Sequence, residues 1–560
     1  MIRDLTRLGR DELDVLIIGG GITGACLAHD AALRGLSVGL IEKGDFGGAT
    51  SSASSKLLHG GIRYLQQGRI DKIRESAVER AAFQTIAPHL SHYVPFLIPT
   101  YPGLMRGRTA LAAGVALYEW LTAGPNRHIA HGTKQVPRPS RHQVAAWLRQ
   151  LEALAPSERP TGASAIYESH VYSTERMTLA FLKSAAANGA SVANYVEAVS
   201  VVRQGPRVSG LAARDALTGR DLTIGARLVV NAAGPWIGAL DRSFAIGPLD
   251  RRITGFSRGA HIVTRQVLRD VAVALPTGRQ AQALVTRGGR HVFLIPWRGC
   301  TLIGTSDRPF TGDLDDVRPT EEDVNDLLQD VNHALPGAGL RQDDVRHAFA
   351  GLYPLTESAL REDVYQGTGD YQIVDHAVRD RVEGVISVLG AKFTTARRVA
   401  ERAVDVALRK LGRPHVPCRT STTPLAGGEN PDVARFRQAL AGRHPALSET
   451  TLDHLVAAYG TEADAVIASR PEGGRLSPDR ESLEAEVSFA VEHEMAVRLE
   501  DVVFRRTGLG TVGHPGLDCL RRCAGIIGVR LGWGPEEREA QVLRTERQFP
   551  IGAGPVGPAA

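Results

Sequence analysis

The sequence predicts an α/β fold that combines a Rossmann-like dinucleotide-binding domain, a domain built on an antiparallel sheet, and a C-terminal helical domain. Three observations predict this fold class. A glycine-rich strand–turn–helix–strand pattern covers residues 15–42, a later strand runs into a second glycine turn at residues 222–236, and residues 430–545 are mostly helical in pattern. A linker rich in Pro, Gly and Thr, at residues 414–429, separates the last region from the rest.

The first pattern begins with a short apolar strand and continues into a glycine turn. Gly19, Gly21 and Gly24 have G-x-G-x-x-G spacing and open an alanine-rich helix over residues 22–34. In a dinucleotide-binding unit such glycines allow a tight turn, close approach of the backbone to a pyrophosphate, and close packing of helix on strand. The N-terminus of the helix offers unpaired N–H groups to the phosphates.

Glu42 ends the second strand of this unit and lies 18 residues after Gly24. An acid at this place reaches the ribose hydroxyls of a dinucleotide. Because an acid rather than an arginine disfavours a 2′-phosphate, the expected ligand is FAD or NAD and not NADP. The alternative is a glycine-rich turn in an ordinary βαβ unit that binds no dinucleotide.

The bulk composition is that of a globular protein. The chain has 560 residues, of which 43% are hydrophobic and 23% charged, and this length suggests about three to four domains. The net charge of +5 is small against 66 Lys and Arg residues, so it suits an anionic substrate or membrane surface and does not indicate nucleic acid. Five scattered cysteines indicate a reducing compartment, and no metal site is expected. Neither a signal peptide nor an apolar run of about 20 residues is predicted.

Two loops after the second strand carry the polar side chains of the expected site. The hydroxyl run at residues 50–56 could be a flexible linker, but at this position hydroxyl and N–H groups can line a pyrophosphate and the edge of a flavin. His59, Gly60 and Gly61 come next, followed by Arg63. Paired glycines let the backbone pass close to a flat ring, with a histidine and an arginine on either side.

Residues 104–122 are apolar but interrupted by Arg106, Arg108 and Glu119, and they are too few to span a membrane. They are expected either to lie in a membrane interface or to form a buried core helix. Residues 125–160 are interpreted as rich in loops.

The string TSSASSKLLHGGIRYL at residues 50–65 resembles the signature of FAD-dependent glycerol-3-phosphate dehydrogenases of the respiratory class. Further blocks resemble this family, in the family's order and over most of the chain: APHL (87–90), LVVNAAGPW (228–236), GAHIV (259–263), IPW (295–297), LIGTSD (302–307), AGLYPL (350–355), GAKFTTARRVAE (390–401) and VEHEMAVRLEDVVFRRT (491–507). The resemblance implies FAD as cofactor and oxidation of sn-glycerol 3-phosphate to dihydroxyacetone phosphate by hydride transfer to flavin N5. It also implies a quinone as electron acceptor, a cytoplasmic protein bound peripherally to the inner face of the cell membrane, and a possible homodimer.

The resemblance also implies a domain plan. An FAD-binding domain of the D-amino-acid-oxidase and glutathione-reductase type is assembled from residues 1–80, 170–250 and 350–412. The substrate-binding domain, with the antiparallel sheet, comprises residues 81–169 and 251–349. The rest of the chain is divided into a linker at 413–429, a C-terminal helical domain at 430–546 and a disordered tail at 547–560.

Matching residue by residue, the resemblance implies roles for particular side chains. His59 matches the histidine that faces the flavin and is the expected general base, the alternative being a structural flavin contact. Arg63, whose alternative role is a surface salt bridge, and Lys392 complete the expected catalytic set. Substrate contacts are expected from Arg63, Tyr64, Arg258, His261, Tyr353, Lys392 and Thr395, although His261 could equally be a core histidine.

The expected cofactor contacts are spread over six segments of the chain. They are Gly19, Gly21, Ile22, Thr23, Gly24, Glu42, Lys43, Thr50, Ser51, Ser52, Ser54, Ser55, Lys56, Leu58, His59, Gly60, Gly61, Val196, Ala232, Ala233, Gly234, Trp236, Gly390, Lys392, Phe393 and Thr394. The last four precede a helix predicted over residues 396–411. Its N-terminus is expected to point at the flavin pyrimidine carbonyls, whose negative charge rises on reduction.

One block departs from the family pattern. Where the family usually reads A-G-x-R-P-L, this chain has Tyr353 in place of the arginine, and Gly255 and Arg258 stand where Arg and Lys are expected. Tyrosine has a hydroxyl but neither a charge nor a bidentate fork. Losing one buried cation from a phosphate site costs about 1.5–3 kcal/mol, so Arg258 or another basic residue is expected to compensate.

Without such compensation, the same flavin chemistry is expected on another polyol phosphate or small hydroxy compound. Three further alternatives are an oxidase that uses O₂, a flavin-bearing scaffold or redox sensor without turnover, and a dehydrogenase that uses NAD alone. The presence of His59, Arg63 and Lys392 argues against the scaffold.

Overall fold

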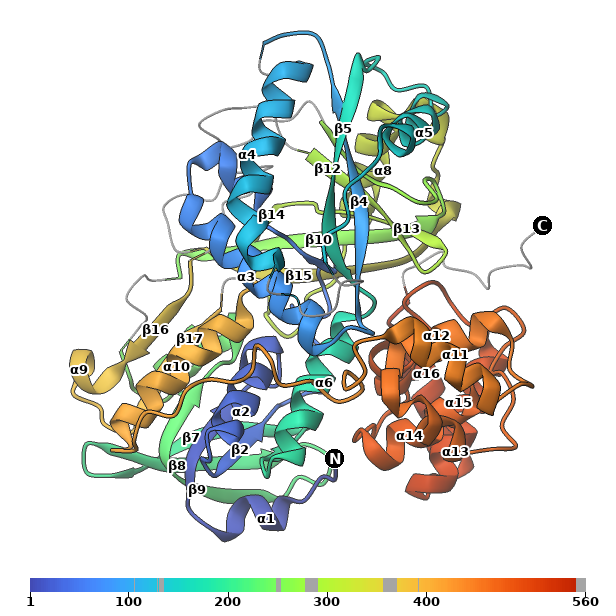
Figure 1. Cartoon of the computed structure of the whole chain (residues 1–560). Coiled ribbons are helices and arrows are strands. Elements are labelled where there is room, and N and C mark those ends of the chain that lie inside the picture. Colours follow the sequence, from blue (N-terminus) through green and yellow to red (C-terminus); the bar gives the residue numbers. More distant parts are fainter. Residues whose placement is uncertain are drawn as a thin grey trace.

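The computed structural model contains two β-sheets, each covered by helices, and a C-terminal helical domain (Figure 1). It describes residues 1–104, 106–127, 129, 135–247, 253–276, 291–355, 370–390 and 392–549. For Arg63, Gln66, Gln67 and Arg127 it describes the backbone alone.

The first sheet contains the strand predicted before the glycine turn. Its strands are β1 (Leu13–Ile18), β2 (Val38–Ile41), β6 (Ser191–Ala193), β9 (Asp221–Asn231), β16 (Gln372–Asp375) and β17 (Val385–Leu389), together with β8 (Arg207–Asp215), which pairs with β9, and β7 (Val196–Gln204), which pairs with β8. β1 pairs in parallel with β2 and β9, β6 and β17 extend the parallel part, and β16 adds an antiparallel edge. β1 is buried along its whole length, as expected for a strand covered on both faces.

Helices cover both faces of this sheet. They are α1 (Leu5–Arg10), α2 (Ile22–Leu33), α6 (Thr174–Ala187), α7 (Ile237–Ser243), α9 (His376–Asp380) and α10 (Ala396–Lys410). On one face, Leu27 of α2, Phe181 of α6 and Ala400 of α10 share a core with β1. On the other face, Leu8 of α1 packs with β8 and β9. The glycine turn therefore leads into the central helix of a packed layer.

The second sheet belongs to the region predicted to be the substrate-binding domain. Its strands are β3 (Leu57–Leu58), β4 (Ser91–Thr100), β5 (Gly162–Val171), β10 (Gly255–Arg265), β11 (Ala272–Pro276), β12 (His291–Trp297), β13 (Cys300–Gly304), β14 (Arg308–Phe310) and β15 (Val345–Leu355). The pairing is antiparallel except between β11 and β4, which run in parallel. The predicted antiparallel sheet is therefore present, with the pairing of β11 and β4 as a parallel exception among the described strands.

Four helices pack on the second sheet: α3 (Ile70–Ile86) and α4 (Arg108–Arg127) on one face, α5 (Arg141–Glu152) and α8 (Glu321–Ala334) on the other. α5 lies in the segment that was interpreted as rich in loops. It is stabilised by a capping box, in which the N–H of Gln143 donates to Oγ of Ser140 (3.2 Å), and by burial of Trp147 and Leu151 against the sheet. The capping box and the apolar positions are both visible in the local sequence, and the loop interpretation was wrong because it overlooked them.

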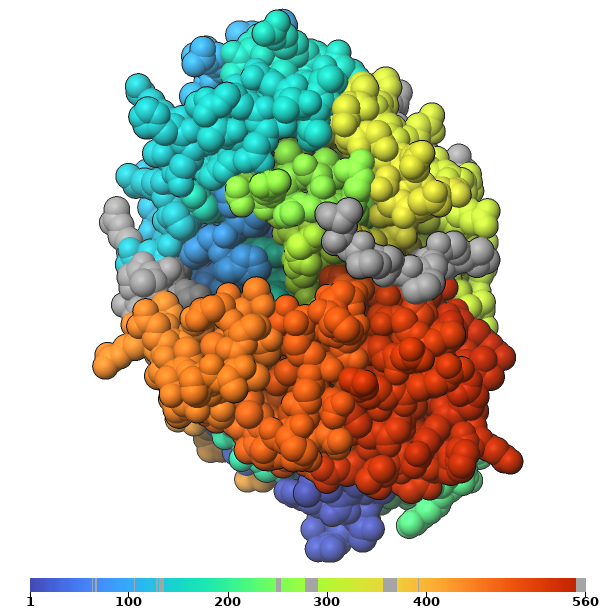
Figure 2. All heavy atoms as spheres, turned by 90° about the vertical axis from the view of Figure 1, so that its right-hand side faces the viewer, coloured from blue at the N-terminus to red at the C-terminus, as the bar shows by residue number. Residues whose placement is uncertain are grey.

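The C-terminal domain lies beside the first sheet and below the second, and it fills the lower half of the view in Figure 2. Its helices are α11 (Val433–Arg443), α12 (Glu449–Tyr459), α13 (Ala463–Ala468), α14 (Glu484–His493), α15 (Leu517–Leu531) and α16 (Pro535–Glu546), together with a π-helix, η7 (Asp501–Arg506). Residues 547–549, which were included in the expected disordered tail, are ordered, since the Phe549 ring packs 5.0 Å from that of Phe504. Residues 550–560 lie outside the described residues.

Short 3₁₀ helices connect several elements: η1 (Ile62–Gln67), η3 (Gly234–Trp236), η4 (Pro336–Ala338), η5 (Gln342–Asp344) and η6 (Gly460–Glu462). Within the described ranges, no helix has the length and apolar character that crossing a membrane requires.

Candidate functional site

The N-terminal glycine turn packs directly against the second glycine turn. A Cβ atom on Gly19, which has φ +107°, would lie 2.7 Å from the carbonyl oxygen of Ala232, and one on Gly24 would overlap the carbonyl oxygen of Gly19. The N–H of Ala232 donates to the carbonyl of Ile18 (2.9 Å). The two segments predicted to hold a dinucleotide, including neighbouring Ala233 and Gly234, thus meet at the ends of β1 and β9.

The start of α2 is arranged like an anion-binding helix terminus. Its N-cap is Gly21, which has no side chain of its own to cap the helix. The N–H of Ile22 donates to Oγ of Ser51 (2.9 Å), which joins the hydroxyl loop to the first helical turn. A Cβ on Gly390 would lie 2.5 Å from Oγ1 of Thr23, so the predicted C-terminal block also reaches this helix end.

Glu42 stabilises the turn through backbone N–H groups. Its carboxylate accepts from the N–H of Gly20 (2.7 Å) and of Gly44 (2.8 Å), and its carbonyl accepts from the N–H of Val196 (2.7 Å). Burial raises the pKa of Glu42 despite these hydrogen bonds. The acid is thus held beside the glycine turn, where a ribose would be recognised.

Lys43 and Trp236, both predicted cofactor contacts, come together at a more exposed place. Lys43 Nζ lies 4.3 Å from the centre of the Trp236 ring, and both side chains bind Asp315, to which Trp236 Nε1 donates at 2.8 Å. Asp315 lies in the loop before α8, and no local sequence signal indicated its position.

The hydroxyl loop is an ordered part of the site and not a flexible linker. Thr50 Oγ1 donates to the carbonyl of Leu352 (3.1 Å), and Ser52 Oγ donates to that of Ala49 (2.8 Å). Ser54 Oγ accepts from the N–H of Lys56 (3.2 Å). These hydrogen bonds fix the loop between the glycine turn and the second sheet.

Lys56 makes a buried ion pair. Its Nζ lies 2.9 Å from Oε1 of Glu175 and 3.2 Å from Oγ1 of Thr174, at the start of α6. Burial would raise the pKa of Glu175, but the neighbouring Lys56 outweighs it and holds that pKa below its usual value. The structure therefore places Lys56, like the buried Leu58 of β3, beneath the loop as a structural residue.

The turn of His59, Gly60 and Gly61 lies over a buried polar group that the sequence did not indicate. The N–H of Gly60 donates to Oε2 of Glu168 (2.6 Å), and Tyr118 donates to Oε1 of the same carboxylate (3.2 Å). A Cβ on Gly60 would overlap the Tyr118 hydroxyl, so only glycine fits. The His59 ring lies 6.0 Å from that of Phe293 on the second sheet. The turn is thereby fixed on both sides.

Lys392 and Tyr64, predicted from different segments, lie together beside this turn. Lys392 Nζ is 4.3 Å from the centre of the Tyr64 ring and 3.4 Å from Oγ of Ser76. A Cβ on Gly61 would lie 3.4 Å from Cβ of Ser76, which places this face of α3 against the glycine pair. Burial, and then the charge of Lys72, lower the pKa of Lys392 to about 8.

Lys72 is a basic residue of this group that sequence reasoning missed. It lies one helical turn before Ser76 on α3, and its Nζ is 3.3 Å from Glu75 and 3.2 Å from Asp370. The side chain of Arg63 and the whole of Ala391 lie outside the described residues, so only the backbone of Arg63, in η1, is placed near this group.

β10 and β15 separate the remaining predicted substrate residues onto two faces. His261 faces Ser55, with Nε2 3.3 Å from its Oγ, and stacks on Phe349 at 5.2 Å. Tyr353 is four residues after Phe349 on β15 and so lies on the same face. Burial lowers the pKa of His261 to about 3, so the ring is neutral at physiological pH.

Arg258 lies on the opposite face from His261, because an odd separation along a strand reverses the side-chain direction. Its guanidinium pairs with Asp323 (2.8 Å) and donates to Oγ1 of Thr320 (3.2 Å), at the start of α8. The structure thus does not bring Arg258 to the group around His59, and the expected compensation for Tyr353 by this residue finds no support.

The start of α10 fits a bound cofactor. Thr395 is its N-cap but makes no capping hydrogen bond, and its buried Oγ1 has no partner among the residues that the structure describes. Thr394 is buried beside it, and Phe393 packs 6.3 Å from Phe83. A ligand with polar ring atoms would satisfy both the buried Thr395 hydroxyl and the uncapped end of this helix. The described residues contain no cluster that could hold a metal ion.

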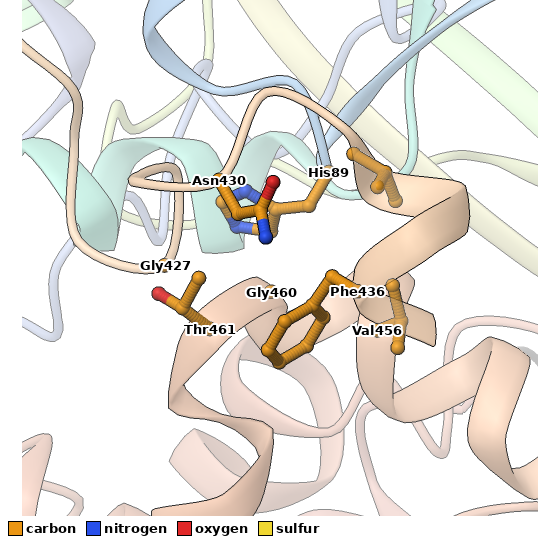
Figure 3. A pocket seen from close by; sticks show the side chains of 8 residues that line it. His89, Gly427, Asn430, Phe436, Val456, Gly460 and Thr461 are labelled. Carbon is orange, nitrogen blue, oxygen red and sulfur yellow. The ribbon is translucent and has the colours of Figure 1, made fainter. Parts of the chain in front are cut away.

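A small pocket lies elsewhere, where the linker meets the C-terminal domain (Figure 3). His89 faces Asn430, while Phe436 and Val456 line the side formed by α11 and α12. The lining contains none of the predicted site residues, so this pocket is separate from the predicted site.

Comparisons with known proteins agree with the geometry of the site. A family model described as FAD dependent oxidoreductase matches residues 14–405, and one described as the C-terminal domain of alpha-glycerophosphate oxidase matches residues 418–538. A glycerol-3-phosphate dehydrogenase of Synechocystis sp. is 32% identical over 97% of each chain, and one of Mycobacterium leprae is 34% identical over 96% of this chain and 88% of its own.

A solved structure covers the whole architecture. The glycerol-3-phosphate dehydrogenase from Bacillus halodurans, complexed with FAD, matches with a TM-score of 0.73 and 27% identity over 99% of this chain and 98% of that chain. The predicted fold class and the predicted cofactor, FAD, are thereby confirmed.

Proposed function

Since the chain belongs to the family of FAD-dependent glycerol-3-phosphate dehydrogenases, we propose that it oxidises sn-glycerol 3-phosphate to dihydroxyacetone phosphate. The observation that carries this proposal is the grouping of the His59 turn with Lys392 and Tyr64 beside α3. A general base, a cation for the phosphate and a dinucleotide-binding turn are the parts that this reaction needs.

Bound FAD supplies the hydride acceptor, and the protein supplies proton transfer and charge. His59 is the proposed base that takes the proton from the reacting hydroxyl. Its turn is held by the Gly60 N–H bond to Glu168, so the imidazole is presented from a rigid backbone. The N-terminus of α10, where Thr395 makes no capping hydrogen bond, is the proposed source of stabilisation for negative charge on the reduced ring.

Lys392 and Lys72 are the proposed cations for the substrate phosphate. Burial, and then the charge of Lys72, lower the pKa of Lys392, and an anion bound beside Lys392 would favour its charged form. Lys72 already contacts Glu75 and Asp370, so the phosphate would compete with these carboxylates for its ammonium. Arg63, which follows the His59 turn in the sequence, is the third proposed cation.

A second substrate class stays under consideration because of two observations. Tyr353 brings no charge to the face of His261, and Arg258 is engaged by Asp323 on the opposite face. A site with fewer cations would suit another polyol phosphate or a small hydroxy compound. Steady-state assays with a dye as electron acceptor, comparing glycerol 3-phosphate, glycerol and other polyol phosphates, separate the two. A preference for glycerol over its phosphate would overturn the first proposal.

The electron acceptor is proposed to be a quinone. The C-terminal family model is named after an oxidase, so reduction of O₂ is the competing outcome. Measuring peroxide release during turnover, with and without a soluble quinone, distinguishes them: the proposal expects quinone reduction without a stoichiometric yield of peroxide.

Peripheral binding at the cytoplasmic face of the cell membrane is proposed from α4. The side chains of Leu117 and Trp120 are 43% and 69% exposed, and Leu104 just before the helix is 87% exposed, whereas Tyr118 and Leu121 are buried. One face of the helix thus packs in the core, and the other exposes apolar side chains to solvent. Arg108 begins the helix, and Arg106 lies just before it. Flotation with anionic vesicles tests this, with Trp120→Ser expected to weaken binding.

We also propose that the protein forms a homodimer, and sedimentation velocity tests this oligomeric state.

A further inference from the structure

A buried ion cluster joins the C-terminal domain to the loop that follows Glu42. Asp45, whose side chain is fully buried, accepts from Arg506 through Nη1 (2.8 Å) and Nη2 (2.9 Å) and from Arg505 through Nε (2.6 Å). Asn194 Nδ2 donates to the same carboxylate (2.9 Å). Asp45 and Arg505 are separated by 460 residues, so this contact joins two domains.

A second carboxylate closes the cluster from the side of the C-terminal domain. Asp501 accepts from Arg505 Nη2 (2.6 Å) and from the hydroxyl of Tyr195 (2.7 Å), which lies just before β7. Two acids and two arginines therefore balance in charge inside the interface. The neighbouring arginines outweigh burial and hold the pKa of Asp45 far below its usual range, so the carboxylate stays ionised.

The loop that Asp45 belongs to lies against the dinucleotide turn. A Cβ on Gly20 would be 2.7 Å from the Phe46 ring, and the N–H of Gly47 donates to the carbonyl of Gly20 (3.0 Å). Gly44, on the other side of Asp45, donates its N–H to the Glu42 carboxylate (2.8 Å). The position of Asp45 thus decides where residues 43–48 lie relative to both the turn and the ribose-binding acid.

We propose that Arg505 and Arg506 are positioning residues for the FAD site: acting through Asp45, they hold the loop of residues 43–48 and with it Glu42 in the geometry that binds the cofactor. Docking of the C-terminal domain and binding of FAD then stabilise each other by the same factor, as linkage requires. This inference rests on FAD as cofactor and is independent of the identity of the substrate.

A control residue distinguishes positioning from simple docking of the domain. Lys183 of α6 pairs with Glu462 (2.7 Å) and Glu494 (3.0 Å) in the same interface, and neither of these ion pairs involves residues 43–48. Lys183→Met should therefore weaken docking only modestly, so that the domain stays mostly docked and Asp45 keeps its arginine partners. Arg505→Met removes the bonds to both acids, and Arg505→Lys restores the charge.

The first measurement is the rate at which the full-length holoenzyme releases FAD after dilution, followed by flavin fluorescence. Arg505→Met should release FAD roughly tenfold faster than the unaltered protein, a coupling of ordinary size, and Arg505→Lys less than that. Lys183→Met should leave the rate within about twofold. Equal rates for Arg505→Met and Lys183→Met would overturn the proposal.

The second measurement needs no variant and covers the case in which Arg505→Met does not fold. Protease cleavage within the linker at 413–429 reports undocking of the C-terminal domain. If docking and FAD binding are coupled, saturating the partly FAD-depleted protein with FAD should slow cleavage roughly tenfold. A cleavage rate that does not respond to FAD would overturn the proposal, whether or not the protein turns over glycerol 3-phosphate.

Discussion

The ammonium of Lys392 lies 4.3 Å from the centre of the Tyr64 ring, although the two residues belong to segments more than 300 positions apart. This contact brings the block before α10 to the turn that carries His59. It places a cation beside the turn of the proposed base, and the first three predictions below depend on that arrangement.

Lys392→Met should lower kcat/KM for glycerol 3-phosphate by about 10- to 150-fold, the equivalent of one charged hydrogen bond of about 1.5–3 kcal/mol. The loss should be much smaller with glycerol, which has no phosphate for the lysine to bind. Lys410→Met is a suitable control, because Lys410 pairs with Asp375 at the far end of α10. Steady-state kinetics of the three proteins provide the comparison, and an equal loss on both substrates would contradict a role in phosphate binding.

The pH dependence of kcat/KM should show a falling alkaline limb. Burial and Lys72 lower the pKa of Lys392 to about 8, while Glu75 and Asp370 act in the opposite direction. The lysine is therefore charged below that pH and loses its charge above it, so affinity for the phosphate should fall as the pH rises through about 8. Lys392→Arg stays charged and should move this limb to higher pH. Profiles of the two proteins that coincide would rule out Lys392 as the titrating group.

His59→Asn should slow flavin reduction about 10²- to 10⁴-fold, the usual contribution of a general base, while FAD stays bound. The side-chain amide keeps the size and part of the polarity of the imidazole. Rapid mixing under anaerobic conditions measures the rate, and the visible spectrum checks retention of the cofactor. A reduction rate near that of the unaltered protein would leave His59 as a structural flavin contact.

Arg258→Met should leave KM for glycerol 3-phosphate within about twofold and lower stability instead. Breaking a buried ion pair by removing one partner costs about 3–5 kcal/mol, and the loss here should lie at the low end because Arg308 Nε stays 3.5 Å from Oδ1 of Asp323. Thermal unfolding measures the loss of stability, and steady-state kinetics of the same preparation measure KM. A tenfold rise in KM with unchanged stability would instead return Arg258 to the substrate site.

Lys56→Met should also destabilise the protein by about 3–5 kcal/mol, since Glu175 would be left as an uncompensated buried charge. Arg437→Met is the matched control: its partners Glu449 and Asp453 are exposed, and such surface pairs contribute about 0–1 kcal/mol. The midpoints of urea unfolding give the difference. Similar midpoints for the two variants would show that the Lys56 pair contributes no more than a surface pair.

The parts of the site that could be predicted from the sequence are those whose geometry is local. The turn at Gly19 and Gly24 depends on spacing within one strand–turn–helix unit, and the position of Glu42 follows from the next strand. Alternation along β10 could also have shown that Arg258 and His261, three residues apart, face opposite sides. That inference needed only the prediction that both lie on one strand.

Other parts depend on tertiary packing and leave no local signal. Glu168 of β5 and Tyr118 of α4 lie close to Gly60 only in the folded chain. The local sequence around each residue does not indicate this contact. Lys72 resembles any lysine on a helix until α3 packs against the glycine pair. The pairing of Asp45 with Arg506 crosses more than 400 residues, so only the folded chain shows it.

The central claim is that this flavin site accepts hydride from glycerol 3-phosphate with His59 as the base. The most direct test mixes the FAD-loaded protein with glycerol 3-phosphate in the absence of oxygen and follows the flavin absorbance. The account predicts complete bleaching in a single turnover, faster than with glycerol and strongly slowed in His59→Asn. Flavin that keeps its oxidised spectrum with saturating glycerol 3-phosphate would contradict it.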